Sequence, residues 1–165
     1  MNVTFDVKLT PKDLFTFNMR QSYRGMQGVL SIVLPLLLFV QAGLNYKNVS
    51  IGTTLLYVGL GTLFLVYVPI SLWGRANKAL KTNSALANTL HFTFAEDAIC
   101  VTHGNEKAEF KWENIYKMIS TKSQVLIYTN RINAYVIPKT QITEQYTELA
   151  KLANVKLEKH RVQMK

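Results

Sequence analysis

The chain has 165 residues, a formal net charge of +9 and a single cysteine, Cys100. One cysteine excludes an intrachain disulfide, so the soluble part suits a reducing compartment. The basic residues flank two apolar runs and form no long run with interleaved aromatic residues, so we predict no nucleic-acid partner. The length leaves room for one small soluble domain beside the two runs.

Residues 1–24 are predicted to form a cytoplasmic arm, a strand followed by a helix. Apolar and polar residues alternate through residues 2–9, which is typical of a half-buried strand. Thr10 suits an N-cap, Pro11 the first helical position, and Asp13 the positive end of the helix dipole. We expect this helix to lie at the membrane surface or on the soluble domain before the first apolar run.

Two apolar runs follow the arm. No charge occurs in the 22 residues between Arg24 and Lys47, nor in the 27 residues between Lys47 and Arg75. At about 1.5 Å per residue the runs reach roughly 33 Å and roughly 40 Å, enough to cross a hydrocarbon core of about 30 Å. We therefore expect residues 25–74 to form an antiparallel transmembrane hairpin, with spans at about 25–46 and 50–73.

Two other structures fit such runs. An uncleaved signal sequence is one, but about 24 residues precede the first run, no small-residue cleavage site follows it, and a second run comes soon after. A buried helical hairpin of a soluble protein is the other. The apolar character extends all the way round both predicted helices, which favours membrane spans.

The interiors of the runs indicate what the hairpin does. Neither contains Asp, Glu, Lys, Arg or His, the residues that pumps, proton relays and voltage sensors place at this depth. Gly52 and Gly59 share one face of the second run and favour close helix packing. Anchoring is therefore the expected role, and a small pore of oligomerised hairpins is a less favoured alternative.

Basic residues at the outer ends of the two runs predict the orientation. The turn between the runs carries only Lys47, whereas five basic residues flank the hairpin. The five are Arg20, Arg24, Arg75, Lys78 and Lys81. The positive-inside rule then places the chain in the cell membrane with both termini in the cytoplasm. Each of these residues contributes on the order of 1 kcal/mol beside an anionic leaflet, so they are candidate lipid-headgroup contacts, or they serve only to set topology.

A basic linker is expected at residues 75–87, followed by a small domain at residues 88–165. Alternation predicts a strand near Leu90 and a hairpin over residues 98–112 that turns at residues 103–105. Further strands are predicted, giving a meander of about five. They are residues 115–120, 124–129 and 134–138.

The domain is expected to close with a helix. Thr143 is its predicted N-cap, Glu144 lies in its first turn, and apolar residues then recur on one face. The polar, basic tail from Lys156 to Lys165 is expected to fray.

No residue constellation predicts catalysis. The three histidines are scattered, and the Cys100–His103 spacing has no second pair to complete a zinc site. No glycine-rich phosphate loop, G-x-S-x-G or H-E-x-x-H motif occurs. We therefore expect no enzymatic activity, no cofactor and no metal.

Trp112, Tyr128 and Lys139 are the candidate partner-binding residues of the domain. The two aromatic rings could line a peptide- or lipid-binding groove on the sheet, or they could be core aromatics of a small domain. Lys139 could recognise an anionic group, or it could keep the domain soluble.

Several segments resemble a known family. They are FKWENI at 110–115, LIY at 126–128 and AYVIPK at 134–139, before a terminal helix and after a two-span hairpin. This arrangement resembles the YcxB-like family of small bacterial membrane proteins. The resemblance implies an α+β membrane protein in which a strongly bent, antiparallel, pleckstrin-homology-like sheet, capped by a C-terminal helix, faces the cytoplasm. It implies no catalytic residue.

Two functions fit these expectations. The first is a membrane-anchored, non-enzymatic interaction module that binds a protein partner or a second copy of itself. The alternative is a regulator whose basic cluster senses anionic lipid in the bilayer. Salt distinguishes them, because headgroup attraction weakens as ionic strength rises and an apolar contact does not.

Overall fold

The computed structural model describes residues 2–164, and the chain falls into two compact units. The sheet unit comprises Met1–Leu14 and Ala79–Lys165, and the hairpin unit comprises Phe15–Lys78. Helices and two sheets of strands make this an α+β protein, as expected.

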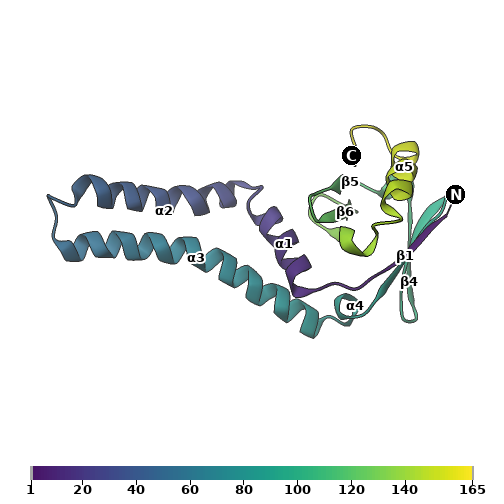
Figure 1. Cartoon of the computed structure of the whole chain (residues 1–165), viewed down its shortest axis with the longest axis horizontal. Helices are drawn as coiled ribbons and strands as arrows, with labels where there is room; N and C mark the ends of the chain where they lie inside the picture. Colours follow the sequence, from purple (N-terminus) through teal and green to yellow (C-terminus); the bar gives the residue numbers. More distant parts are fainter. Residues whose placement is uncertain (1, 165) are drawn as a thin grey trace. The chain divides into compact units, whose positions relative to one another are not determined.

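The N-terminal strand β1 (Val3–Val7) belongs to the sheet unit. It pairs antiparallel with β2 (Leu90–Phe94), so that Val3 lies opposite Phe94. The strand predicted at residues 2–9 is thus confirmed. Residues 1–24 do not form a separate arm, however, because the apolar face of β1 is buried in the same sheet as β2. Along the chain, the whole hairpin unit lies between these two paired strands, as the colours of Figure 1 show.

The first sheet has the order β1-β2-β3-β4 and is antiparallel throughout. β3 (Ala98–His103) and β4 (Glu106–Lys111) form the predicted hairpin, which turns at Gly104. Gly104 has a φ of 55°, a left-handed conformation that glycine adopts without steric cost. Trp112 does not extend β4, because it begins a short 3₁₀ turn, η1 (Trp112–Asn114).

The second sheet has the order β7-β6-β5-β8. β5 (Lys117–Ser120), β6 (Gln124–Tyr128) and β7 (Ala134–Pro138) are antiparallel neighbours and correspond to the three further strands predicted. β8 (Val162–Gln163) pairs parallel with β5. The expected single meander of about five strands is instead two sheets, because η1 separates β4 from β5 and these two strands do not pair. β1 and β8, from the two ends of the chain, add one strand to each sheet.

Aromatic side chains join the two sheets. Phe5 stacks on Phe92 and Phe94, with ring centroids 5.7 and 5.4 Å apart. Tyr135, on β7, meets Phe92 and Phe110 edge-on at 5.8 and 5.6 Å. Edge-to-face pairs at these distances add stabilisation beyond the area they bury. These contacts place one part of the core of the sheet unit between the first sheet and β7.

Helix α5 (Tyr146–Lys156) follows the second sheet and buries Leu149, Leu152 and Ala153. The helix is confirmed, but its N-cap is Gln145 and not Thr143. The Thr143 hydroxyl instead donates to the carbonyl oxygen of Lys139, at 3.3 Å. That carbonyl belongs to the short 3₁₀ turn η2 (Lys139–Gln141), so the threonine caps the turn before the helix.

As far as Met164, the C-terminal tail packs on the sheet unit and does not fray as expected. The Arg161 guanidinium donates to the backbone carbonyl oxygens of Glu113 at 2.9 Å and Tyr116 at 3.2 Å, and also to that of Ile115. The Met118 amide donates to the Arg161 carbonyl oxygen at 2.8 Å. Arg161 thus holds the tail against the β5 edge, and Val162 is buried.

Helix α1 (Pro11–Ser22) begins where the sequence predicts. The Thr10 amide donates to the Asp13 carboxylate at 2.9 Å, and the Asp13 amide donates to the Thr10 hydroxyl at 3.3 Å. These reciprocal bonds satisfy two amide groups at the helix start. In the hairpin unit, the Phe15 ring meets the Trp73 ring edge-on at 5.4 Å.

Helices α2 (Met26–Asn45) and α3 (Ile51–Thr82) form the antiparallel hairpin seen in Figure 1. Both are long and apolar enough to cross a membrane. Gly61 provides their close contact, since a Cβ built there would lie 3.0 Å from the Phe39 ring. The predicted packing glycines Gly52 and Gly59 do not, because a Cβ at either would meet no atom of the facing helix.

The predicted basic linker at residues 75–87 is mostly helical. α3 continues through Thr82, and a single turn, α4 (Ser84–Ala87), follows it. Alanine, leucine and lysine, which favour helix, supply most of the sequence up to Thr82.

Candidate functional site

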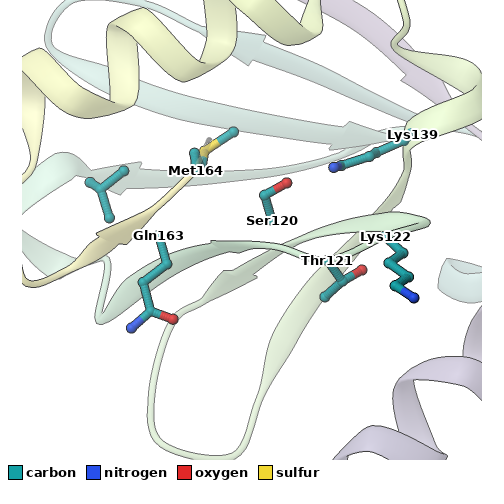
Figure 2. A pocket seen from close by; sticks show the side chains of 7 residues that line it. Ser120, Thr121, Lys122, Lys139, Gln163 and Met164 are labelled. Carbon is teal, nitrogen blue, oxygen red and sulfur yellow. The ribbon is translucent and has the colours of Figure 1, made fainter.

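A surface hollow of about 680 Å³ lies at one end of the second sheet, and we call it the Lys139 hollow. Its walls come from the end of β5, the turn into β6, the start of η2 and the tail that includes β8 (Figure 2). The lining residues are Ser120, Thr121, Lys122, Lys139, Val162, Gln163 and Met164. Segments from three parts of the chain therefore meet here.

Hydrogen bonds hold the polar wall of the Lys139 hollow. The Thr121 hydroxyl accepts from the Gln124 amide and donates to the Gln124 carbonyl oxygen, both at 2.9 Å. The Ser120 hydroxyl lies 2.8 Å from the Tyr146 hydroxyl, which links β5 to α5. The Lys139 amide donates to the Ser123 carbonyl oxygen at 2.9 Å. The turn between β5 and β6 is thus tied to the start of η2.

The Lys139 ammonium is positioned by an aromatic ring. Its Nζ atom lies 4.7 Å from the centroid of the Tyr146 ring, within the range of a cation–π contact. Lys122 brings a second positive charge to the same hollow, and none of the seven lining residues is acidic. Val162 and Met164 add an apolar wall. This combination suits an anionic group carried on a partly apolar ligand.

The structure does not place Trp112 and Tyr128 on this surface. Trp112 is 5% exposed and its indole N–H donates to the Ala95 carbonyl oxygen at 2.9 Å. Tyr128 is 1% exposed, with the Lys117 ammonium 4.9 Å from its ring centroid. Both rings are core aromatics, so the predicted partner-binding surface loses its two aromatic members because the small domain uses them for packing.

The five basic residues predicted to contact lipid are all exposed. Four of them lie in the hairpin unit, and Lys81 lies in the sheet unit. Arg75 lines a second hollow, of about 190 Å³, which we call the Arg75 hollow. Its other lining residues are Ser22, Gly28, Ser31, Tyr67, Val68, Ser71 and Leu72.

The tail residues of the Lys139 hollow, Val162 to Met164, were not expected from the sequence. Their polar, basic surroundings predict fraying, and the pairing of a two-residue strand leaves no periodic signal. The alternation of apolar Val162 and Met164 with Gln163 is the one local hint, and both apolar side chains are buried.

Metal-binding residues do not gather within residues 2–164, where no group of three or more His, Cys, Asp or Glu side chains could hold an ion. Cys100 is half-buried on β3. His91 pairs with Asp6 across β2 and β1 at an exposed position.

Comparison with protein families gives a match that spans most of the sheet unit. Residues 94–153 match the YcxB-like protein family. The resemblance predicted from the sequence is thus confirmed over this segment. The YcxB-like segment runs from the end of β2 into α5 and therefore includes β3 to β7. Comparisons with curated proteins and with solved structures found no match.

Proposed function

We propose that this protein is a membrane-anchored, non-enzymatic interaction module. The α2–α3 hairpin crosses the membrane, and the sheet unit presents a binding surface to the cytoplasm. The observation that carries the proposal is the pairing of β1 with β2, because the chain must leave the sheet unit and return to it. Two antiparallel spans satisfy this requirement, since an even number of crossings brings the chain back to the same side.

The exposed apolar surface of the hairpin supports membrane insertion over a buried soluble hairpin. Only 17% of the apolar window of α2 and 11% of that of α3 is buried within the protein. Leu37 and Leu55, for example, are 57% and 65% exposed. Such a continuous apolar surface is unfavourable in water and favourable in hydrocarbon. Apart from the bonds that Pro35 and Pro69 remove, each helix also satisfies its interior backbone hydrogen bonds within itself, as a membrane span requires.

For the sheet unit we propose the pleckstrin-homology-like arrangement that the family resemblance implies. Two antiparallel runs of strands, β1 to β4 and β5 to β7, followed by one C-terminal helix, support this arrangement. The proposal includes one departure from a continuous domain, because β1 comes before the hairpin and the remaining strands come after it.

The orientation follows from charge. The turn between α2 and α3 has Lys47 as its one charged residue, whereas the opposite ends of the helices carry Arg20, Arg24, Arg75 and Lys78. Basic residues remain preferentially on the cytoplasmic side of a membrane. The sheet unit, which is continuous with those ends, is therefore proposed to be cytoplasmic.

The Lys139 hollow is the proposed docking surface, and its proposed occupant is an acidic, partly apolar segment of a protein partner. Two lysines and no acidic residue line the hollow, which favours a negatively charged ligand. Val162 and Met164 give the ligand an apolar contact as well. Because apolar contact and charge act together, binding should weaken only partly in high salt.

Site-directed photocrosslinking in native membranes tests this function. In one variant a photoreactive residue replaces Gln163 in the hollow. In a second variant the same photoreactive residue replaces Glu109, an exposed position on β4. We expect a discrete protein adduct from the Gln163 probe alone, and its loss when Lys122→Glu and Lys139→Glu are combined. Equal adducts from both probes, or an adduct that survives the charge reversal, would overturn this docking surface.

Anionic-lipid sensing is the second candidate function, and one observation favours it. The hairpin unit has five basic residues and no acidic one, so it must find its counter-charges elsewhere. Binding of the protein to vesicles of different charge, measured at low and high salt, separates this function from the first.

A further inference from the structure

The Arg75 hollow lies wholly within the hairpin unit, at the end of the hairpin that carries the basic residues. The end of α1, the start of α2 and the last apolar turns of α3 enclose it. Its volume of about 190 Å³ is several times the roughly 30 Å³ that one water molecule occupies in the liquid. A small charged group therefore fits inside.

Close packing of the chain shapes this hollow. A Cβ at Gly28 would lie 2.5 Å from the Ser22 carbonyl oxygen and from the Tyr23 Cα, so only glycine lets α1 end so near the start of α2. The Ser31 hydroxyl donates to the Gly28 carbonyl oxygen at 2.7 Å. The backbone that lines this side is thus held in place before any ligand arrives.

Hydrogen-bond donors surround the remaining space. Arg75 carries a guanidinium, a planar group that binds phosphate oxygens through two parallel N–H donors. Ser22, Ser71 and Tyr67 supply hydroxyl groups, whereas the Ser31 hydroxyl already donates to Gly28. The N-terminus of α2 also lies at this end, and its helix dipole favours a negative charge. No carboxylate is present among the lining residues.

The hairpin unit has no carboxylate that could serve as a counter-charge for Arg75. From residue 14 to residue 95 the sequence contains no Asp or Glu, so no carboxylate of the hairpin unit can pair with Arg75. Among residues 2–164 no salt bridge to the Arg75 guanidinium is found. A guanidinium left without a counter-charge beside hydrocarbon is unfavourable.

We propose that the Arg75 hollow binds the phosphate of an anionic phospholipid headgroup. This inference rests on the proposed membrane anchoring, because Arg75 is the first charged residue after 27 uncharged ones and so lies where a span would leave the hydrocarbon. Val68 and Leu72 form the apolar side of the hollow, toward the acyl chains. Free inorganic phosphate offers the same oxygens but no acyl chains, so it is the weaker ligand.

Native mass spectrometry of the full-length protein, purified in detergent with added phosphatidylglycerol or phosphatidylcholine, tests the proposal. We expect one tightly retained phosphatidylglycerol and roughly tenfold weaker retention in Arg75→Gln. Arg24→Gln is the matched control, because it removes the same charge from the same end without lining the hollow, and it should weaken retention less than about twofold. Ser71→Leu keeps every charge but fills the hollow, so it should weaken retention at least as much as Arg75→Gln.

Three results would overturn the proposal. Equal losses of retention in Arg75→Gln and Arg24→Gln would mean diffuse attraction to the surface. Equal retention of the two lipids would mean no selectivity for anionic headgroups. Displacement of the lipid by equimolar inorganic phosphate would assign the site to the free ion. Carbonate extraction of the same variants separates this question from anchoring. If wild-type protein stays in the membrane while no lipid is retained, the headgroup site fails and the membrane anchor does not.

Discussion

The side-chain amide of Gln124 donates a hydrogen bond of 2.8 Å to the backbone carbonyl oxygen of Asp13. Gln124 begins β6 and is 2% exposed, whereas Asp13 lies in the first turn of α1. The bond therefore ties the segment that leads into the hairpin to the second sheet, within the sheet unit.

Replacing Gln124 tests this link. Gln124→Met keeps the length of the side chain and should lower the free energy of unfolding by about 1 kcal/mol. Gln124→Glu puts a buried carboxylate against a carbonyl oxygen and should cost more than about 3 kcal/mol at pH 7. At pH 4 the cost should shrink, because the protonated acid can donate to the Asp13 carbonyl oxygen. Thermal unfolding in detergent micelles at both pH values measures this, and equal effects of Met and Glu at pH 7 would contradict it.

Phe5 provides a test of whether β1 belongs to the folded domain. Its ring is buried against Phe92 and Phe94, so Phe5→Ala should lower the free energy of unfolding by about 3–5 kcal/mol. Thr4→Ala, on the exposed face of the same strand, is the control and should change it by less than about 0.5 kcal/mol. Chemical unfolding monitored by near-ultraviolet circular dichroism gives both values. Similar small effects would mean that β1 is a dispensable arm.

Arg161 is expected to keep the tail paired with β5. Arg161→Lys preserves the charge but cannot reach three separate carbonyl oxygens in the same way, so β8 should detach from β5. Hydrogen exchange at Val162 and Gln163 should then rise at least roughly tenfold, which corresponds to about 1.4 kcal/mol. Lys159→Ala, at a nearby exposed position, should leave exchange unchanged. Unaltered exchange in Arg161→Lys would show that strand pairing alone holds the tail.

Gly61 and Gly59 form a matched pair for testing the hairpin contact. Gly61→Leu places a side chain against the Phe39 ring, which lies 3.0 Å from the position of a Cβ, and should destabilise the helix pair by about 1–3 kcal/mol. Gly59→Leu points into open space and should not destabilise it. Thermal loss of helical circular dichroism in micelles compares the two. A larger effect at Gly59 would identify an interface with another chain on that face.

Tyr135 is expected to make stability fall at high pH. Burial between aromatic rings raises the pKa of its hydroxyl above the usual value near 10. The folded state therefore holds this proton more tightly than the unfolded state. The contribution of the protonated Tyr135 hydroxyl to stability is complete below about pH 10 and is lost as the pH rises through the folded-state pKa. As the pH rises above about 10, wild-type protein should lose stability more steeply than Tyr135→Phe, as measured by melting temperature. Parallel curves would contradict this.

Local sequence signals predicted local structure well. Thr10 caps the helix as expected, with Asp13 returning a bond to the Thr10 amide, and Gly104 makes the expected turn. Each depends on residues a few positions apart, so alternation and capping preferences suffice. The pairing of Val3 with Phe94 could not be predicted in the same way, because an alternating strand shows which face is buried but not which distant strand lies beside it.

The candidate site was harder to predict than the fold. Tyr128 ends a strand in which every residue is buried, and the unbroken apolar run from Val125 to Tyr128 is the signal that could have assigned its ring to the core. The Lys139 hollow forms only because the tail returns to β5. Arg161 holds the tail there by donating to backbone carbonyl oxygens, and such contacts leave no signature in the sequence. Similarly, Gly61 and Gly59 are alike in sequence, and only the helix rotation distinguishes them.

The paired strands β1 and β2 are proposed to lie on one side of a membrane, with the hairpin between them in the chain crossing it. Cysteine labelling tests this directly, after Cys100→Ser removes the natural thiol. Asn48→Cys places a thiol in the turn between α2 and α3, and Asn105→Cys places one in the exposed turn between β3 and β4. With a membrane-impermeant maleimide, we expect Asn48→Cys to be labelled in intact cells and Asn105→Cys only after permeabilisation. Labelling of both only after permeabilisation, or of both before it, would contradict the account.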